Sequence, residues 1–131
     1  MFSVFLIMAT TLGCVNDLTP HGGWSSPVVS DNKLLIGNVD GNLVRLDPVT
    51  GNMDNGWSYP REDGLGAIYA DVLVADGAVY GSGYTCRGDD CEGEIFALDL
   101  TSGLSIWGQN GLPLKTKLIG QVGLMDKTLL I

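Results

Sequence analysis

The sequence predicts an all-β protein in which one four-stranded unit is repeated along the chain. Three observations support this fold class. The 131 residues include 19 glycines and 5 prolines, short apolar runs are separated by turn residues, and a set of Asp, Gly and Trp positions recurs. Hydrophobic residues make up 45% of the chain and charged residues 17%, so there is enough apolar material for a buried core.

Each repeat begins with a hairpin pattern: an apolar run, an Asp-centred turn and a second apolar run. The turn aspartates are Asp31, Asp76 and Asp126, so the repeat length is 45 and then 50 residues. A four-stranded propeller blade takes about 40 to 50 residues, and the 3.6-residue period of helical repeats is not seen. The sequence therefore predicts a partial β-propeller with two four-stranded antiparallel blades and the first hairpin of a third.

The expected blades are residues 24–66 and 67–116, followed by an incomplete third blade at 117–131. Strands of the first blade are expected around residues 27–30, 33–38, 42–46 and 57–59. Because residues 129–131 align with the second strand of the first repeat, the pattern stops within a blade. A closed propeller needs about four to eight blades, so we expect a fragment of a longer protein.

The second half of each repeat carries an Asp, a Gly four residues later, and then a Trp. These residues are Asp47, Gly51 and Trp57 in the first repeat and Asp99, Gly103 and Trp107 in the second. We expect the Asp and Gly to form a tight turn in which Gly takes a positive φ. A Trp wedged between neighbouring blades removes about 150 to 250 Å² from water, so all six residues are predicted to dock blade against blade.

The run Ala97-x-Asp99-x-x-Ser102-Gly103-x-x-x-Trp107 resembles the tryptophan-docking motif of PQQ-like repeats. Such repeats occur in quinoprotein dehydrogenases and in BamB-like outer-membrane assembly lipoproteins. The resemblance covers roughly residues 24–131. The first copy departs from the motif, with Arg45 in place of the usual Ala and two additional residues before Trp57.

Residues 1–13 are apolar and uncharged and end at Cys14. A membrane-spanning helix needs about 20 apolar residues, so this segment indicates an export signal. Gly13-Cys14 resembles a bacterial lipobox, although Thr11 stands where that family usually has Leu. The resemblance implies a lipid on Cys14, a linker at 14–23 and a membrane-anchored protein of the bacterial cell envelope. An ordinary cleaved signal or a buried apolar strand are the alternatives.

Cys86 and Cys91 lie in an insertion between Gly83 and Gly93. Outside the cytoplasm this pair is expected to form a disulfide that pins the insertion. Asp89, Asp90, Glu92 and Glu94 make the same segment acidic, which admits a calcium site with oxygen ligands. Their spacing matches no EF-hand, so a solvated acidic loop without metal is the simpler interpretation.

Other sites have little support in the sequence. His21 is the only histidine, which leaves no second nitrogen ligand for zinc and no partner for a nucleophile. The net charge is −8 and the 7 basic residues are scattered, so binding to nucleic acid is not expected. No catalytic residue set is identifiable.

Three functions follow from this pattern. The first is a non-catalytic envelope lipoprotein that acts as a scaffold for other envelope proteins, as the resemblance to BamB-like proteins implies, and it needs no cofactor. The second is a fragment of an alcohol or sugar dehydrogenase that would bind PQQ and calcium. The third is a sensor or carbohydrate-binding propeller.

Overall fold

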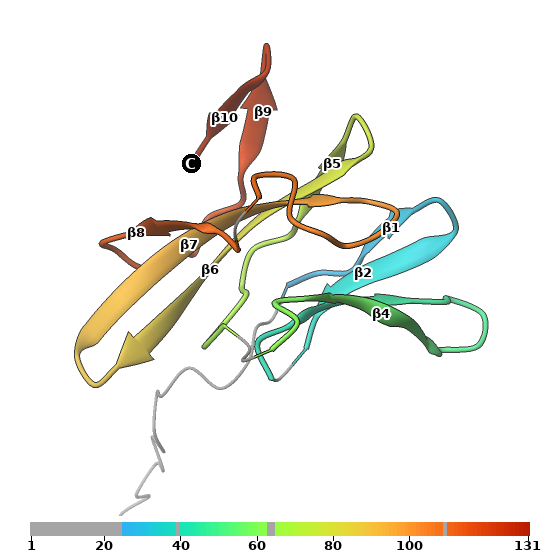
Figure 1. Cartoon of the computed structure of the whole chain (residues 1–131), viewed down its shortest axis with the longest axis horizontal. Helices are drawn as coiled ribbons and strands as arrows, with labels where there is room; N and C mark the ends of the chain where they lie inside the picture. Colours follow the sequence, from blue (N-terminus) through green and yellow to red (C-terminus); the bar gives the residue numbers. More distant parts are fainter. Residues whose placement is uncertain (1–24, 39, 63–64, 109) are drawn as a thin grey trace, which may run out of the picture.

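The computed structural model describes residues 25–38, 40–62, 65–108 and 110–131 (Figure 1). These residues form ten strands and no helix. The strands are β1 (Val28–Ser30), β2 (Lys33–Gly37), β3 (Leu43–Leu46), β4 (Met53–Tyr59), β5 (Leu73–Ala75), β6 (Ala78–Arg87), β7 (Asp90–Asp99), β8 (Leu112–Leu114), β9 (Gly123–Met125) and β10 (Thr128–Leu130). The expected export segment 1–13, the linker 14–23 and Cys14 lie outside the described residues.

Antiparallel pairing arranges these strands in three sheets. The order is β1-β2-β3-β4 in a first blade, β5-β6-β7-β8 in a second blade, and β9-β10 in a third hairpin. The predicted fold class, with two four-stranded antiparallel units and the first hairpin of a third, is thus confirmed. One strand differs from its expected span: β4 begins at Met53, not near residue 57. A bulge between Val44 and Leu46 lets β4 pair with β3 back to that point.

The three hairpin turns have the same backbone conformation. Both central residues of each turn have positive φ, which is the requirement of a type I′ turn. The pairs are Asp31 (φ 48) with Asn32 (φ 57), Asp76 (φ 50) with Gly77 (φ 75), and Asp126 (φ 47) with Lys127 (φ 65). Short Asp, Asn and Gly residues tolerate this region best, which explains why the turn aspartate recurs.

The turns after β3 and β7 also match each other. Asp47 Oδ1 accepts hydrogen bonds from the backbone N–H groups of Val49 and Thr50 at 2.9 Å. Asp99 Oδ1 accepts from both the backbone N–H and the hydroxyl of Ser102 at 2.7 Å. These bonds lower the pKa of both carboxyl groups. The glycine that closes each turn has φ of +72 or +69, so the expected tight turn forms in both repeats.

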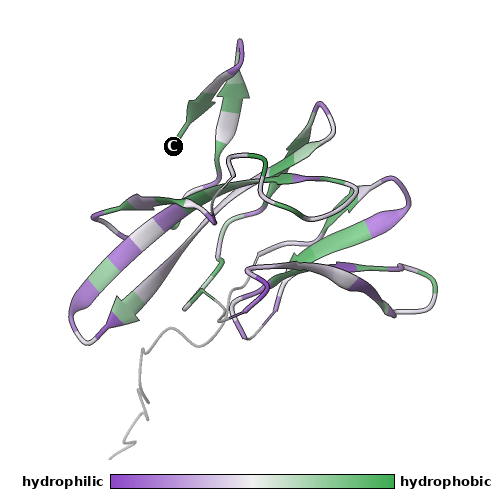
Figure 2. Cartoon of the chain, viewed as in Figure 1, coloured by the Kyte–Doolittle hydropathy of each residue, from purple (hydrophilic) through white to green (hydrophobic). Residues whose placement is uncertain are grey.

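The hydrophobic core lies between the two blades. Its buried members come from both four-stranded sheets and from the segment that joins them: Leu35, Leu43, Trp57, Tyr59, Ile68, Val72, Val79, Phe96 and Leu98. The rings of Tyr59 and Phe96, one from each blade, have centroids 4.7 Å apart. In Figure 2, β2 and β5 are coloured mainly as hydrophobic, whereas the tip of the β9–β10 hairpin is hydrophilic. The two blades therefore stack through their apolar residues.

Candidate functional site

The longest feature of the second blade is a projecting hairpin formed by β6 and β7. In the first blade the sheet pairing stops at Gly37 and Leu43, whereas in the second blade it continues to Arg87 and Asp90. We call the continuation, residues 83–94, the arm; Figure 1 shows it extending away from the blade. The insertion that the sequence indicates between Gly83 and Gly93 is thus a pair of hydrogen-bonded strands.

Cys86 and Cys91 lie directly opposite each other on the two strands of the arm. They form a disulfide, with their Cα atoms 4.1 Å apart. The expected disulfide is therefore present in the structure. It joins the strands one residue pair before the tip, where Gly88 turns the chain with φ +65.

The base of the arm is held on both edges. On the β6 side, Ala67 and Tyr84 exchange backbone hydrogen bonds of 3.0 and 3.1 Å, and Gly66 N–H donates to Thr85 Oγ1. On the β7 side, β8 pairs from Gly93 to Ile95. A Cβ at Gly93 would collide with the backbone carbonyl of Thr116, so glycine permits this close approach. The arm is thus a supported extension of the sheet.

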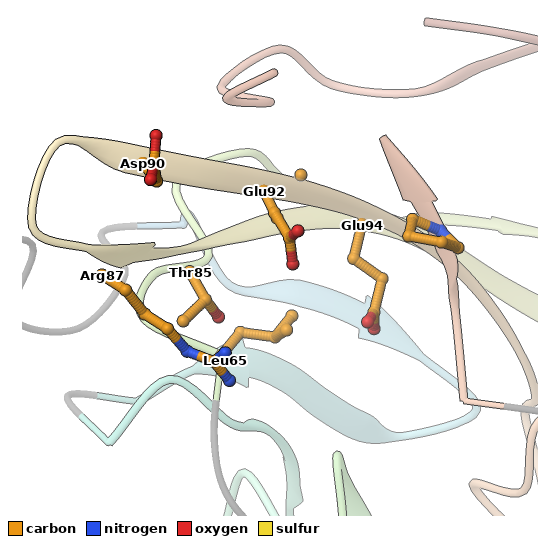
Figure 3. Close-up of a pocket in the computed structure, with 8 residues that line it drawn as sticks. Leu65, Thr85, Arg87, Asp90, Glu92 and Glu94 are labelled. Carbon is orange, nitrogen blue, oxygen red and sulfur yellow. The ribbon is translucent and has the colours of Figure 1, made fainter. Parts of the chain in front are cut away.

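A cavity of about 340 Å³ lies along one face of the arm. Its lining residues are Leu65, Thr85, Arg87, Asp90, Glu92, Gly93, Glu94 and Pro113. In Figure 3 the side chains of Glu92 and Glu94 leave β7 on the side to which Thr85 and Arg87 leave β6. Three carboxylates and one guanidinium line the cavity, so its lining carries a net negative charge. Such a lining suits positively charged groups that donate hydrogen bonds.

Glu94 connects the arm to the first blade. The hydroxyl of Tyr59 donates a hydrogen bond to Glu94 Oε1 at 2.5 Å, and the Tyr59 side chain is buried. Burial, and then the bond to Glu94, raise the pKa of Tyr59 far above its usual value. The phenol therefore stays protonated as a donor, and it fixes one carboxylate of the cavity.

The four acidic residues named as a calcium alternative do not converge. Asp89 is in the turn, while Asp90, Glu92 and Glu94 are spaced along β7. Within the described ranges, no group of three or more His, Cys, Asp or Glu side chains is placed to hold a metal ion. The donor set therefore does not fit a calcium cage, and we derive no chemistry from such an ion.

The predicted docking residues occupy different surroundings in the two repeats. Trp57 lies in β4 and is buried, 3% exposed, and its Nε1 donates to the carbonyl of Leu100 in the second blade. Asp99 and Gly103 form the turn against which Trp57 packs. Asp47 and Gly51 form the matching turn of the first blade. Trp107 lies outside the strands, between that second-blade turn and β8, and is half-buried.

Two contacts of the site were not expected from the sequence. Arg45, which stands at the usual Ala position, lies 5.3 Å from the centroid of the Trp57 ring and donates to the same Leu100 carbonyl. Tyr59 reaches the arm from the other blade. A sequence signal exists only for Tyr59, which follows Trp57 at a spacing of two and therefore shares its strand face.

The chain matches no protein-family model and no curated protein. In the described part of the chain, no helix is long and apolar enough to span a bilayer.

Proposed function

We propose that this protein is a non-catalytic scaffold of the bacterial cell envelope, with a lipid on Cys14, and that it binds other envelope proteins through the arm. The observation that carries the proposal is the arm itself: a disulfide-bonded hairpin that is fixed at its base and lines a cavity with more acidic than basic side chains. Binding residues placed on a rigid element need little ordering when a partner arrives.

The disulfide supports an exported location. Structural disulfides persist in oxidising compartments such as the periplasm and are rare in the cytosol. Cys86 and Cys91 are bonded to each other, which leaves Cys14 as the third cysteine of the chain. A lipid on Cys14 would place the propeller-like blades at a membrane surface, with the linker 14–23 between them.

The cavity indicates which partner groups the arm would bind. Glu92 is exposed, and it lines the same cavity as Glu94, whose carboxylate Tyr59 fixes. A Lys or Arg side chain of a partner would meet two acceptors there, with the apolar surfaces of Leu65 and Pro113 available for its methylene groups. We therefore expect a basic segment of a partner protein to bind the cavity.

The two other functions have less support. The residues of the arm do not fit a calcium cage, and no described feature favours PQQ, so we do not propose a dehydrogenase. The cavity lining contains no aromatic side chain, so no observation specifically favours binding of sugars.

Site-specific crosslinking in cells tests the proposal. A photoreactive residue at Pro113, an exposed residue of the cavity lining, should crosslink the full exported chain to a defined envelope protein. Glu92→Lys should abolish the product, because it reverses one charge in the cavity. Asp89→Lys makes the same charge change on the arm outside the cavity lining and should leave the product unchanged. Equal products from both variants, or none from the parent chain, would count against the arm as the binding site.

Anchoring is tested separately. Metabolic labelling with an alkyne fatty acid should modify the parent chain and leave Cys14→Ala unlabelled. Fractionation should then find the parent chain with membranes and the variant in the soluble fraction. Equal labelling of the two proteins would remove the lipid from the proposal and would not affect the crosslinking result.

A further inference from the structure

The tip of the arm presents three consecutive exposed residues, Arg87, Gly88 and Asp89. Strand β6 ends at Arg87 and β7 begins at Asp90, so Gly88 and Asp89 are the two central residues of the hairpin turn. Figure 1 shows this turn at the end of the arm, pointing away from the rest of the second blade. A Cβ built on Gly88 would meet nothing within 4 Å. The tip is therefore open to a partner.

The backbone of the tip is fixed by its turn and by the disulfide. Gly88 has φ +65, whereas Asp89 is not among the described residues with positive φ. A positive φ at only the first central residue is the pattern of a type II′ hairpin turn, which takes Gly at that position. The bond between Cys86 and Cys91 closes a ring around residues 87–90. Arg87 and Asp89 are thus held close together on a backbone of defined shape.

The two charges at the tip are not used inside the molecule. All ion pairs of the described residues lie in the first blade, so none of them involves Arg87 or Asp89. The side chain of Arg87 lines one end of the arm cavity, and Asp89 lies outside that lining. The tip therefore offers a guanidinium and a carboxylate, separated by a single glycine, to a binding partner.

The chemistry of these two groups specifies the partner. A guanidinium binds a carboxylate through two parallel hydrogen bonds. An exposed carboxylate is a good ligand for Mg²⁺ or Ca²⁺, which take oxygen ligands. A receptor that holds a divalent cation beside a carboxylate of its own would bind both groups at once. The tripeptide Arg-Gly-Asp on an exposed turn is what adhesion receptors of this kind recognise.

We propose that Arg87-Gly88-Asp89 is a recognition loop for a cation-dependent adhesion receptor, with Asp89 bound to the cation of the receptor and Arg87 paired with a carboxylate of the receptor. The disulfide-closed turn supports this role, because a loop that is already ordered loses little entropy on binding. The proposal goes beyond the scaffold function and does not rest on it, since the arm would bind the receptor at its tip and not through the acidic cavity.

The ectodomain of an integrin that binds Arg-Gly-Asp peptides is the probe. It is passed over the immobilised full chain in the presence of Mg²⁺, and binding is measured by surface plasmon resonance. We expect saturable binding that EDTA abolishes. A cyclic peptide copy of residues 86–91, Cys-Arg-Gly-Asp-Asp-Cys, should compete for the ectodomain. Its reduced linear form should compete roughly tenfold less well, because it must be ordered on binding.

Two matched variants test the position of the carboxylate. Asp89→Glu keeps the charge and lengthens the side chain by one methylene, which moves the carboxylate away from the cation. It should weaken binding by about 100-fold or more. Asp90→Glu makes the same change at the next residue and should leave binding unchanged. Circular dichroism and a thiol assay verify that both variants keep their sheets and the disulfide.

Three results would overturn the proposal: no saturable binding by the parent chain, binding that survives EDTA, or equal binding by the Asp89→Glu and Asp90→Glu variants. Glu92→Lys separates this proposal from the scaffold function, because it should abolish the crosslinked product of the cavity and leave integrin binding intact. If Glu92→Lys weakened integrin binding as much as Asp89→Glu does, the receptor would be assigned to the cavity and the tip would be excluded as its site.

Discussion

The indole nitrogen of Trp57 donates a hydrogen bond of 3.0 Å to the backbone carbonyl of Leu100. This bond joins the last strand of the first blade to the turn that follows β7 in the second. The same carbonyl accepts from Arg45 Nη1 at 2.6 Å. Because Gly103 leaves room for the ring beside this turn, the indole packs against backbone and fills the gap between the blades.

Substitution of Trp57 should therefore separate the blades. We expect Trp57→Ala to lower the free energy of unfolding by about 3 to 5 kcal/mol, and Trp57→Phe by less, because Phe keeps much of the apolar area and loses the hydrogen bond. Trp107→Ala should lower the free energy of unfolding clearly less than Trp57→Ala, since the Trp107 side chain is only half-buried. Urea titrations followed by circular dichroism measure all three. Equal costs for Trp57→Ala and Trp107→Ala would contradict the described packing.

The two turn glycines separate backbone strain from contact with the ring. Gly51 and Gly103 have φ of +72 and +69, but a Cβ at Gly51 meets nothing within 4 Å, whereas one at Gly103 lies 3.1 Å from the Trp57 ring. Gly51→Ala should cost about 1 kcal/mol from φ alone, and Gly103→Ala should cost more. The comparison is made by urea unfolding of the two single variants. A larger loss at Gly51 would show that the ring contact does not matter.

Local chemistry made the turns predictable from the sequence. The aspartates at 31, 76 and 126 and those at 47 and 99 shape the chain through their own backbone φ or through hydrogen bonds to residues two or three positions away. Such short-range patterns do not depend on the rest of the fold. The repeat length followed from the turns, and with it the four-stranded units.

Contacts between blades were not predictable in the same way. Nothing near Glu94 in the sequence indicates Tyr59, which is 35 positions away. Arg45 replaces the Ala that is usual at its position in the docking motif, yet it contacts the Trp57 ring. The segment between Gly83 and Gly93 was expected as an insertion with a solvated acidic loop. In the structure those glycines allow other segments to approach the strands closely.

Removal of the disulfide should loosen the end of the arm and leave its base intact. In the chain-entropy model a loop as short as the one between Cys86 and Cys91 contributes about 2 kcal/mol. For the variant with both cysteines changed to Ser, we expect faster hydrogen exchange in residues 85–92. Exchange at Tyr84 should be nearly unchanged, because Ala67 still pairs with it. A uniform increase over the whole second blade would show that the bond supports more than the arm.

Acid should destabilise the protein through three aspartates. Hydrogen bonds from turn backbone lower the pKa of Asp47 and Asp99, and those from Lys33 and Arg45 lower the pKa of Asp54. A carboxyl whose pKa is lower in the folded state contributes stability above its unfolded pKa, and that stability is lost as pH falls through the folded pKa. The free energy of unfolding should therefore fall below about pH 4.

Urea unfolding at a series of pH values from about 7 to 2 measures this dependence. Asp54→Asn should make the acid limb shallower, because it removes one of the three groups whose pKa is lowered. Stability that rises toward low pH, or an identical slope in the variant, would contradict the assignment of these groups.

At alkaline pH, the ionisation of Tyr59 should determine how the free energy of unfolding changes with pH. Its pKa is raised by burial and by Glu94, so it stays protonated in the folded state at a pH where the unfolded tyrosine ionises. Such a group contributes stability below its unfolded pKa, and the contribution is lost as pH rises above about 10. Tyr59→Phe should therefore flatten the decline in unfolding free energy above that pH.

At neutral pH, a double-mutant cycle of Tyr59→Phe with Glu94→Gln should give a coupling energy of about 1 to 3 kcal/mol, because the phenol and the carboxylate are each other's partner across the two blades. A coupling near zero would mean that the arm and the first blade are held together by apolar packing alone.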